Sequence, residues 1–450
     1  MMTEFILESA PHAPLGMVSR EIAPDSYLLL DPDTPNWIIL NSMGREIISM
    51  CDGKSTLKEI IKTLCEKYGE SYKESVENVL AFANEMKEKG FIQESKFPPP
   101  QRVNKENTLY ESIWVNVTNA CNLRCIHCHL SSGTPLENEL TTEEICNIIS
   151  EVKELGVKEI VISGGEPFCR KDILEILEYV RNRCERVTLL TNGTLITEEI
   201  AEKLSNLKLA IQVSLDGASK DTQDFIRGKD SYEKTLKGLQ NLVAHNANVR
   251  VAMTIMKRNM DEIQEMADLV KNLGVKYLHF PTLQVKGRAK EYEPVVRLED
   301  EDMVAAVMEM HRLSQAGDII ITVERNIQEE LDTLGQKDLC GAGSSLVSVA
   351  ADGNVYPCAG LHEGEFCAGN IREKSLKEIW KESEVFKKLR QLSVLDIEKC
   401  SSCELKFICG GGCQVDKYHA YGRLDIPTPL CYAQQKIYWY YLCEKKEEIL

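Results

Sequence analysis

Six short apolar runs rich in β-branched residues alternate with amphipathic helical patterns, and this alternation constrains the fold of the 450-residue chain most strongly. The runs lie at residues 112–118, 157–163, 186–191, 209–215, 249–255 and 275–280. Strand–helix repeats with continuously apolar strands indicate a parallel sheet covered by helices. Six repeats are too few to close an eight-stranded barrel. We therefore predict an α/β fold built on an open, partial (β/α)6 barrel.

A cysteine-rich loop, NACNLRCIHCHL, follows the first of these strands. It places Cys121, Cys125 and Cys128 at the spacing C-x3-C-x2-C. Three thiolates at this spacing can bind three irons of a cubane and leave the fourth iron open, as a catalytic cluster requires. A three-cysteine zinc site and incidental thiols are the alternatives. In βα-barrels the chemistry lies at the C-terminal ends of the strands, where this loop begins.

Short polar residues follow the next three strands. The segments are SGGEP (163–167), TNGT (191–194) and SLDG (214–217). The glycines let the backbone approach a ligand closely, and Glu166 can accept a charge-assisted hydrogen bond from an ammonium group. Because these strand ends meet at one edge of a parallel sheet, we expect the polar groups to surround one site together with the cysteine loop.

The three-cysteine loop followed by GGEP resembles the radical S-adenosylmethionine (SAM) superfamily. The resemblance implies a [4Fe-4S] cluster on Cys121, Cys125 and Cys128, with SAM chelating its fourth iron. The positions that match SAM-binding residues are Gly164, Gly165, Glu166, Asn192, Ser214, Asp216 and Arg227. The first three match the motif that holds the SAM amino group, and the last three match the region near its carboxylate or ribose. His127 stands where the family commonly has an aromatic residue, and we do not expect it to bind metal.

Seven further cysteines are grouped after residue 339. Their pattern is Cys340-x12-Gly353-x4-Cys358, then Cys400-x2-Cys403-x5-Cys409-x3-Cys413, then Cys431. A single C-x2-C unit would also suit a zinc ribbon. The complete pattern resembles the SPASM extension of radical SAM enzymes, which implies two auxiliary [4Fe-4S] clusters. Cys340, Cys358 and Cys413 would bind one, and Cys400, Cys403, Cys409 and Cys431 would bind the other.

The first auxiliary set is one cysteine short. Relatives with a full site carry another cysteine shortly before the first, where this chain reads LDTLGQKDL. Either one iron is open or bound by substrate, or Cys367 completes the set. Among the 17 cysteines, those standing singly in helical patterns are interpreted as small buried hydrophobic residues: Cys51, Cys65, Cys146, Cys184 and Cys443. Cys169, just after GGEPF, is interpreted as a packed thiol, with a redox or ligand role as the alternative.

The N-terminal segment reads strand–strand–helix–helix–strand, which suggests a winged-helix-like module. Its first helix is predicted to begin after Thr56 and to end at Gly69, and its second to end at Gly90. Its pattern resembles the PqqD-like domain that recognises leader peptides. We therefore expect an extended leader to pair with a sheet edge; a purely structural cap is the alternative. The prolines of KFPPPQ indicate a linker.

These patterns predict five regions. They are a PqqD-like domain (1–95), a linker (96–110), the radical SAM barrel (111–285), a bridging region (286–339) and a SPASM domain with two auxiliary clusters (340–450). The bridging region is predicted to add a helix, the strand IIITV and a further helix. The formal net charge of -17 argues against nucleic acid or an anionic membrane as the main partner. The chain lacks a secretion signal and any apolar run near the roughly 20 residues that span a bilayer, so we expect a cytoplasmic protein.

The domain order resembles maturases of ribosomally made peptides, in particular sactionine (thioether) synthases of the subtilosin type. The shared stretches are CGAG (340–343), VRVAMTIMKRNMDEI (249–263) and CGGGC (409–413). The resemblance implies cysteine-to-carbon crosslinking through a 5'-deoxyadenosyl radical, a leader-bearing, cysteine-containing precursor, and a reductant such as flavodoxin or ferredoxin. Carbon–carbon or carbon–oxygen crosslinking, side-chain oxidation, and a zinc-binding interaction protein are the alternatives. The sequence does not identify a catalytic acid or base.

Overall fold

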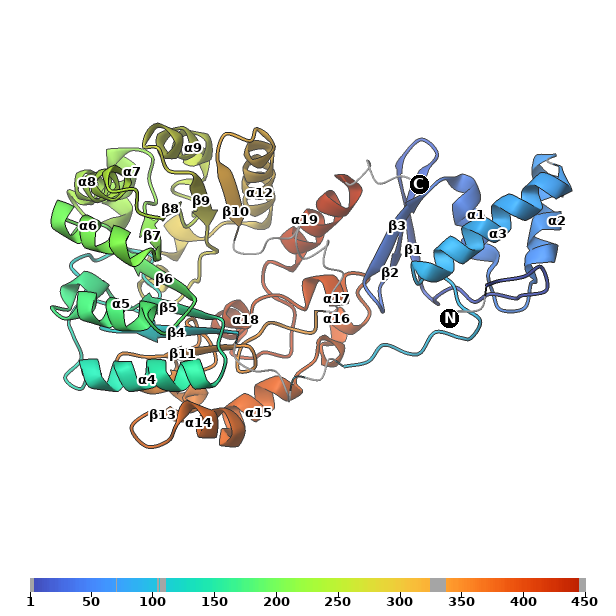
Figure 1. Cartoon of the computed structure of the whole chain (residues 1–450). Helices are drawn as coiled ribbons and strands as arrows, with labels where there is room; N and C mark the ends of the chain where they lie inside the picture. Colours follow the sequence, from blue (N-terminus) through green and yellow to red (C-terminus); the bar gives the residue numbers. More distant parts are fainter. Residues whose placement is uncertain (1–3, 70, 103–104, 106–110, 324–336, 445–450) are drawn as a thin grey trace.

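The computed structural model describes residues 4–69, 71–102, 105, 111–323 and 337–444 (Figure 1). Its largest unit is a ten-stranded sheet with the strand order β10-β9-β8-β7-β6-β5-β4-β11-β12-β13. The six predicted strands are β4 (Ser112–Asn116), β5 (Glu159–Ser163), β6 (Arg186–Thr191), β7 (Ala210–Ser214), β8 (Val249–Ala252) and β9 (Tyr277–Phe280). They are parallel neighbours. The prediction of an open α/β fold with a parallel sheet is therefore confirmed.

Four further strands extend this sheet at its two ends. They are β10 (Ile320–Val323), β11 (Leu346–Val349), β12 (Asn354–Tyr356) and β13 (Gly369–Asn370). β10 pairs in parallel with β9, and β11 pairs in parallel with β4, with Leu346 opposite Ser112. β12 and β13 continue antiparallel from β11. Pairing with β11 satisfies backbone groups of β4 that would otherwise be unpaired at a sheet edge.

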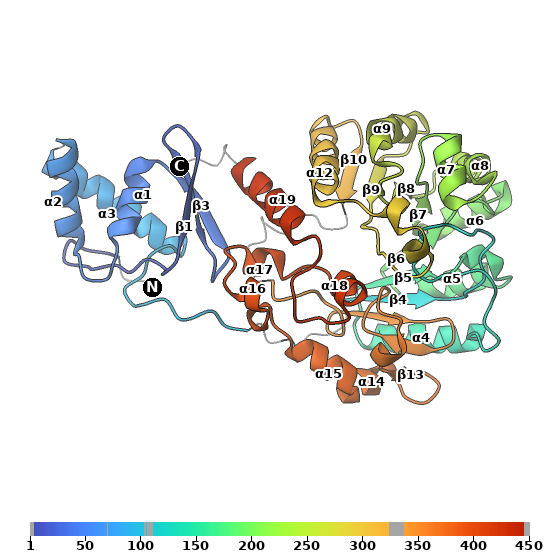
Figure 2. The same ribbon diagram turned by 180° about the vertical axis from the view of Figure 1, so that it is seen from behind.

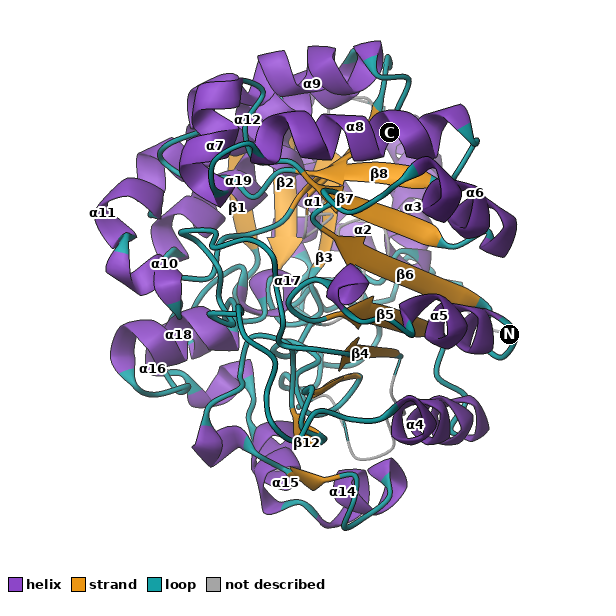
Figure 3. Cartoon of the chain, turned by 90° about the vertical axis from the view of Figure 1, so that its left-hand side faces the viewer, coloured by secondary structure: helices purple, strands orange, loops and turns teal. Residues whose placement is uncertain are grey.

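Helices line the outer side of the parallel strands (Figure 3). They are α4 (Thr142–Glu154), α5 (Ile173–Arg181), α6 (Glu198–Leu207), α7 (Lys220–Arg227), α8 (Ser231–Ala244), α9 (Ile263–Asn272) and α12 (Asp300–Gln315). The apolar faces of these helices and the strands form one core, in which Ile113, Leu189 and Val251 are fully buried. α12 and β10 confirm the helix and strand predicted for the bridging region. The further helix predicted there, up to residue 335, lies outside the described residues.

The N-terminal unit is a three-stranded antiparallel sheet with three helices. Its elements are β1 (Val18–Ala23), β2 (Ser26–Asp31), β3 (Asn36–Leu40), α1 (Ser42–Met50), α2 (Leu57–Tyr68) and α3 (Tyr72–Glu88). Thr56 caps α2 in a reciprocal capping box, and Gly69 ends that helix at φ 72° in the left-handed region, as predicted. The sequence pattern predicted two strands before the helices, at residues 26–31 and 36–41, and two helices, so β1 and α1 are additional to the prediction. The expected final strand was wrong, because only an isolated bridge joins His12 to Gln93.

Two short helices follow the barrel, α10 (Arg288–Glu291) and α11 (Glu293–Val296). The cysteine-rich C-terminal segment has further helices joined by irregular chain: α14 (Leu376–Glu382), α15 (Glu384–Gln391), α16 (Glu398–Ser401), α17 (Lys406–Cys409), α18 (Gln414–Tyr421) and α19 (Cys431–Glu444). Among the described residues, no helix combines the length and apolar character needed to cross a membrane.

The N-terminal sheet packs against α19, as the view in Figure 2 shows. Leu28, Leu30 and Ile39 of the sheet share an apolar cluster with residues of α17 and α19. Buried Lys406 forms an ion pair with Asp33 (Nζ to Oδ1, 2.6 Å). The N-terminal unit is thus attached to the C-terminal cysteine-rich segment through both apolar and ionic contacts.

Candidate active site and cluster-binding residues

A cavity of about 520 Å³ occupies the inside of the curved sheet. Its walls include side chains of three parallel strands, Trp114, Leu190 and Gln212. Two groups of cysteines also line it: Cys121, Cys125 and Cys128 from the loop after β4, and Cys340, Cys358 and Cys413. One cavity therefore contacts both the predicted SAM-cluster loop and the predicted first auxiliary set.

The β11–β12 hairpin explains how two members of the second group meet. Cys340 precedes β11 and Cys358 follows β12. The two strands are antiparallel, so residues that flank the hairpin lie at the same end of it. Cys413 is close enough to both for their charges to influence its thiol, whose pKa is raised well above its usual value mainly by burial.

The two glycines of the GGEP segment lie directly against the cysteine loop. Gly165 N–H donates to the carbonyl of Thr118 (2.7 Å). A Cβ at Gly164 would lie 2.3 Å from the Thr118 carbonyl oxygen, and one at Gly165 would lie 2.2 Å from that of Ala120. No side chain fits at either position. The glycines therefore allow the end of β5 to pack on the backbone of the loop, and their own backbone faces the cavity.

The carboxylate of Glu166 is turned into the protein. Its side chain is fully buried. Thr191 donates its hydroxyl to Oε1 (2.7 Å), and the backbone N–H groups of Asn192 and Phe168 donate to Oε2 (2.7 Å) and Oε1 (3.2 Å). Burial raises the pKa of Glu166, although these hydrogen bonds oppose the increase. In this structure Glu166 ties the end of β5 to the end of β6, and it does not line the cavity.

Asp216 and Arg227 form a buried ion pair behind the cysteine loop. Arg227 Nε lies 2.6 Å from Asp216 Oδ2, and Asp216 Oδ1 accepts the Thr254 N–H at 2.8 Å. Burial alone would lower the pKa of Arg227, but the adjacent carboxylate raises it above its usual value. The guanidinium therefore stays charged, and its Nη1 lies 3.8 Å from the sulfur of Cys125. His127 Nε2 lies 3.3 Å from Asp216, and burial lowers the pKa of His127 to about 4.

Of the predicted SAM-binding residues, five line the cavity and two lie behind its wall. Those on the wall are Gly164, Gly165, Asn192, Ser214 and Arg227. Glu166 and Asp216 are both completely buried and bonded to other protein groups.

Sequence reasoning missed Arg288, which holds the cysteine loop from the other side. Its Nε donates to the carbonyl of Cys125 and its Nη1 to that of Ser132, both at 2.9 Å. The preceding Gly287, at φ 57°, has no room for a Cβ, which would lie 2.6 Å from the His129 carbonyl oxygen. The sequence shows a Gly-Arg pair after the sixth predicted strand, which could have drawn attention to Arg288. No local pattern, however, connects this pair to a loop more than 150 residues earlier.

A second cavity, of about 910 Å³, is lined by Cys400, Cys403, Cys409 and Cys431. The Leu405 N–H points at the Cys403 sulfur (3.4 Å). Gly16, Val18 and Pro32 of the N-terminal unit form part of its wall. This cavity therefore contains all four cysteines of the predicted second auxiliary set and is partly enclosed by the N-terminal unit.

These three thiol groups suit iron–sulfur clusters in their donor chemistry. Burial raises the pKa of Cys125, Cys358 and Cys400 to about 12, and metal binding converts such thiols to thiolates. Leu123 N–H points at the Cys121 sulfur (3.5 Å), and N–H donors of this kind tune cluster ligands. Within the described part of the chain, no three His, Cys, Asp or Glu side chains gather around a single-ion position. In a cubane each thiolate would bind a different iron, so the cysteines of one set need not meet at a single point.

Cys367 does not line the cavity that contains the first auxiliary set. Its thiol points at the carbonyl of Gly369 (3.6 Å). It packs against Tyr356 and Phe366 in an apolar cluster that Cys358 and Cys413 also contact.

Comparison with known proteins assigns the family. The profile of the radical SAM superfamily matches residues 115–270, that of the SPASM iron-sulfur cluster-binding domain matches 340–404, and that of coenzyme PQQ synthesis protein D (PqqD) matches 26–92. The AdoMet-dependent heme synthase of Methanosarcina barkeri is 35% identical, over 70% of this chain and 94% of its own length. This chain therefore belongs to the radical SAM superfamily. It is a SAM-dependent enzyme with a [4Fe-4S] cluster, and its SPASM domain provides for auxiliary clusters.

Two other similarities cover more of the chain. The subtilosin biosynthesis protein AlbA of Bacillus subtilis is 28% identical, over 85% of this chain and 87% of its own length. The crystal structure of Streptococcus suis SuiB bound to the precursor peptide SuiA aligns with a TM-score of 0.61 at 16% identity, over 94% of this chain and 99% of that one. The latter likeness shows that the two chains share a fold.

Proposed function

We propose that this enzyme matures a ribosomally synthesised peptide by joining a cysteine sulfur to a carbon of another residue. The observation that carries the proposal is the shared cavity of about 520 Å³. The three-cysteine loop and the three-cysteine auxiliary set both line it, so a peptide in the cavity would contact both sites. The SAM-cluster ligands would be Cys121, Cys125 and Cys128.

The incomplete auxiliary set supports a role in binding a substrate thiol. Cys340, Cys358 and Cys413 would hold a cluster with one iron free for a substrate thiolate. The position of Cys367, outside the cavity and bonded to Gly369, supports an open iron rather than a fourth protein ligand. Cys400, Cys403, Cys409 and Cys431 would hold the second auxiliary cluster.

The reaction removes two hydrogens for each crosslink. When bound, SAM and the clusters supply a 5'-deoxyadenosyl radical as hydrogen-atom acceptor and, at the auxiliary sites, an electron acceptor. The acceptor carbon loses a hydrogen atom, and the thiol loses a proton as the new carbon–sulfur bond forms. The residues of this chain would position the groups. Arg227, held by Asp216, supports the cysteine loop, and the Gly164–Gly165 backbone lines the cavity where SAM would bind.

Buried amides in the cavity suit a peptide backbone. Gln414 is 3% exposed, and neither its Nε2 nor its Oε1 has a hydrogen-bond partner among the described residues. The same holds for Oε1 of Gln284, which also lines the cavity. A buried polar group without a partner costs about 1–3 kcal/mol. We infer that these amides pair with amide groups of the substrate.

The N-terminal unit is proposed to bind the leader of the precursor. Its three-stranded sheet has two edge strands, β1 and β3, and an extended peptide can add to such an edge. The PqqD match and the AlbA similarity over 85% of the chain support a peptide substrate. The SuiB relative of the same fold was crystallised with a precursor peptide. We propose a flavodoxin or ferredoxin as the electron donor.

The test uses the reconstituted enzyme, SAM, a reductant and short cysteine-containing peptides chosen from the reading frames adjacent to its gene. Mass spectrometry should show a product two hydrogens lighter per crosslink, with cysteines that iodoacetamide no longer alkylates. Cys358→Ala should abolish the product, whereas Cys367→Ala serves as the matched control and should retain it. A product with alkylatable cysteines would refute thioether formation.

A second candidate is carbon–carbon or carbon–oxygen crosslinking, or oxidation of a side chain. The 35% identity with a protein named as a heme synthase shows that closely related chains need not act on peptides. Loss of two hydrogens with every cysteine still alkylatable would favour this candidate. Iron analysis tests the zinc-binding alternative, because three cubanes require about twelve irons per chain.

A further inference from the structure

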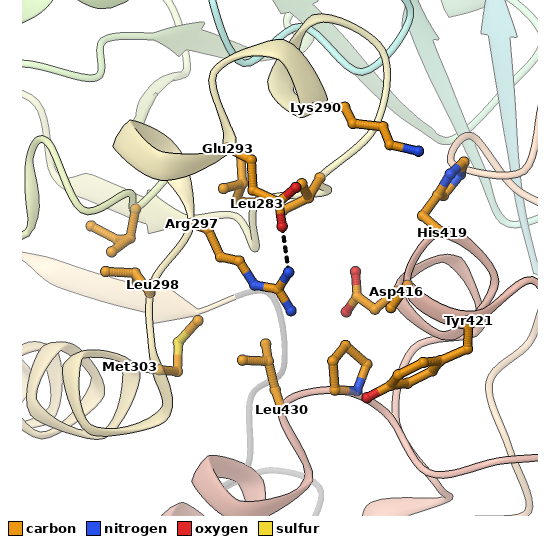
Figure 4. Close-up of a pocket in the computed structure, with 14 residues that line it drawn as sticks. Leu283, Lys290, Glu293, Arg297, Leu298, Met303, Asp416, His419, Tyr421 and Leu430 are labelled. Atoms are coloured by element: carbon orange, nitrogen blue, oxygen red, sulfur yellow. Dashed lines mark hydrogen bonds and ion pairs between the residues drawn. The ribbon is translucent and has the colours of Figure 1, made fainter.

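The cavity of about 520 Å³ that both cysteine groups line is called the reaction cavity below. A smaller cavity lies beside it, and none of the proposed steps uses this smaller cavity. We call it the side pocket; its volume is about 380 Å³. It opens between the chain that follows β8 and β9, the start of α12, and α18 of the cysteine-rich segment. Figure 4 shows side chains from these elements pointing into a common space. The side pocket therefore lies where the barrel meets the SPASM region.

The inner wall of the side pocket is apolar. Ile255, Leu283, Leu298, Met303, Pro429 and Leu430 supply it. Leu298 and Ile255 are each 5% exposed, so this wall belongs to the packed interior. An apolar cavity of this kind favours a ligand group that has little affinity for water.

The remaining wall contains four charged side chains, whose charges balance, together with Val285, His419, Ala420 and Tyr421. Lys290 and Arg297 are cationic, whereas Glu293 and Asp416 are acidic. Arg297 is ion-paired with Glu293, and Figure 4 shows its guanidinium also facing Asp416 across the opening. Because two cations face two carboxylates, the side pocket favours a ligand without net charge.

The side pocket and the reaction cavity share part of their walls. Leu283, Asp416 and Leu430 line both. Asp416 also belongs to α18, which begins immediately after Cys413 of the first auxiliary set. The two cavities are therefore adjacent, and a peptide in the reaction cavity would lie next to the side pocket.

The volume suits one large side chain with adjoining backbone. A cavity of about 150 Å³ accommodates a benzene molecule, and the side pocket has about 380 Å³. We propose that it binds an apolar side chain of the precursor peptide, close in sequence to the residue that is modified. The inference rests on the proposed peptide substrate, and it adds a specificity-determining site to it.

Photo-crosslinking tests the location without depending on the reaction. Ala420 is exposed and lines the side pocket from α18, so p-benzoylphenylalanine replacing it should capture the precursor within its core region. The probe is the cysteine-containing peptide that the enzyme modifies in the test of the proposed function, mixed with the reconstituted enzyme and SAM. The control carries the same replacement at Met308, which is 37% exposed and does not line the side pocket. Capture at the leader alone, or equal capture from both positions, would overturn the inference.

Filling the side pocket tests its specificity. In the wild-type enzyme, replacing the precursor's apolar residue next to the modified position by alanine should lower kcat/KM by about 10- to 100-fold. In Met303→Trp, which fills the side pocket from α12, the same peptide change should cost less than about 2-fold. Met308→Trp, on the same helix, should behave like the wild type. A second filling variant is Ala420→Trp. The inference fails if, in both filling variants, alanine replacement at every apolar position of the precursor lowers kcat/KM as much as it does in the wild type.

These outcomes separate the two proposals. A product with alkylatable cysteines, together with core capture from position 420, refutes thioether formation and supports the side pocket. A thioether product without core capture from position 420 supports thioether formation and refutes the side pocket.

Discussion

Removal of the Asp216 carboxylate should weaken the protein locally around β7 and α7. Asp216 is fully buried, and Arg227 is 7% exposed. In Asp216→Ala, the guanidinium of Arg227 would remain charged in the interior without its partner at 2.6 Å. The Thr254 N–H would also lose its acceptor.

The expected cost follows from this burial. Breaking one side of a buried ion pair destabilises a protein by about 3–5 kcal/mol. Since about 1.4 kcal/mol corresponds to a factor of ten, local opening should become at least about 100-fold more frequent. The double variant Asp216→Ala/Arg227→Met should recover most of this loss, because it removes the uncompensated charge.

Hydrogen–deuterium exchange followed by mass spectrometry measures this opening by segment. Peptides covering Ala210–Arg227 should exchange at least about 100-fold faster in Asp216→Ala, and close to the wild-type rate in the double variant. Asp318→Ala is the control, because the Lys271–Asp318 pair is more than half exposed and should contribute less than about 1 kcal/mol. Exchange within about threefold of wild type in Asp216→Ala, or a double variant as fast as the single one, would refute the reasoning.

Three further predictions concern backbone clearance, helix capping and pH. Gly165→Ala should abolish SAM binding in equilibrium dialysis, because its Cβ would lie 2.2 Å from a backbone oxygen; Gly364→Ala, with open space around it, should bind normally. Thr56→Ala should lower the stability of the N-terminal unit by about 1 kcal/mol in urea unfolding followed by limited proteolysis, since it removes the α2 cap; unchanged proteolysis would contradict this. Glu144 is hydrogen-bonded to Arg372, which lowers its pKa from 4.5 to about 2. Its contribution, below about 1 kcal/mol, should be complete above pH 4.5 and lost as the pH falls towards 2, so the wild type and Glu144→Gln should differ less in urea unfolding at about pH 3 than at about pH 7.

The sequence predicted elements whose signals are local. The capping residues of α2 and six of the ten strands of the large sheet follow from hydrophobic periodicity and turn chemistry within a few residues. The strand β11 could not be found in this way, because its four residues become a strand by pairing with β4, more than 200 positions earlier. The short α1 was similarly obscured by its position directly after β3.

The candidate site shows the same division. Residue identities and spacings were sufficient to select the thiols and the strand-end glycines, because iron–sulfur clusters need thiolates and a close backbone approach needs glycine. They could not show that Glu166 faces inward to hold Thr191 and Asn192, since the direction of a side chain depends on which groups surround it.

The sequence by itself determined the class of protein and the chemical groups available to it. The C-x3-C-x2-C loop, GGEP and the seven later cysteines are sufficient for that, because ligand chemistry depends on residue type and spacing. Only the tertiary structure decided that two cysteine groups share one cavity, that Arg288 holds the loop of the first, and that the side pocket adjoins that cavity. These relations join segments far apart in the chain, and packing of the whole hydrophobic core determines which of them meet.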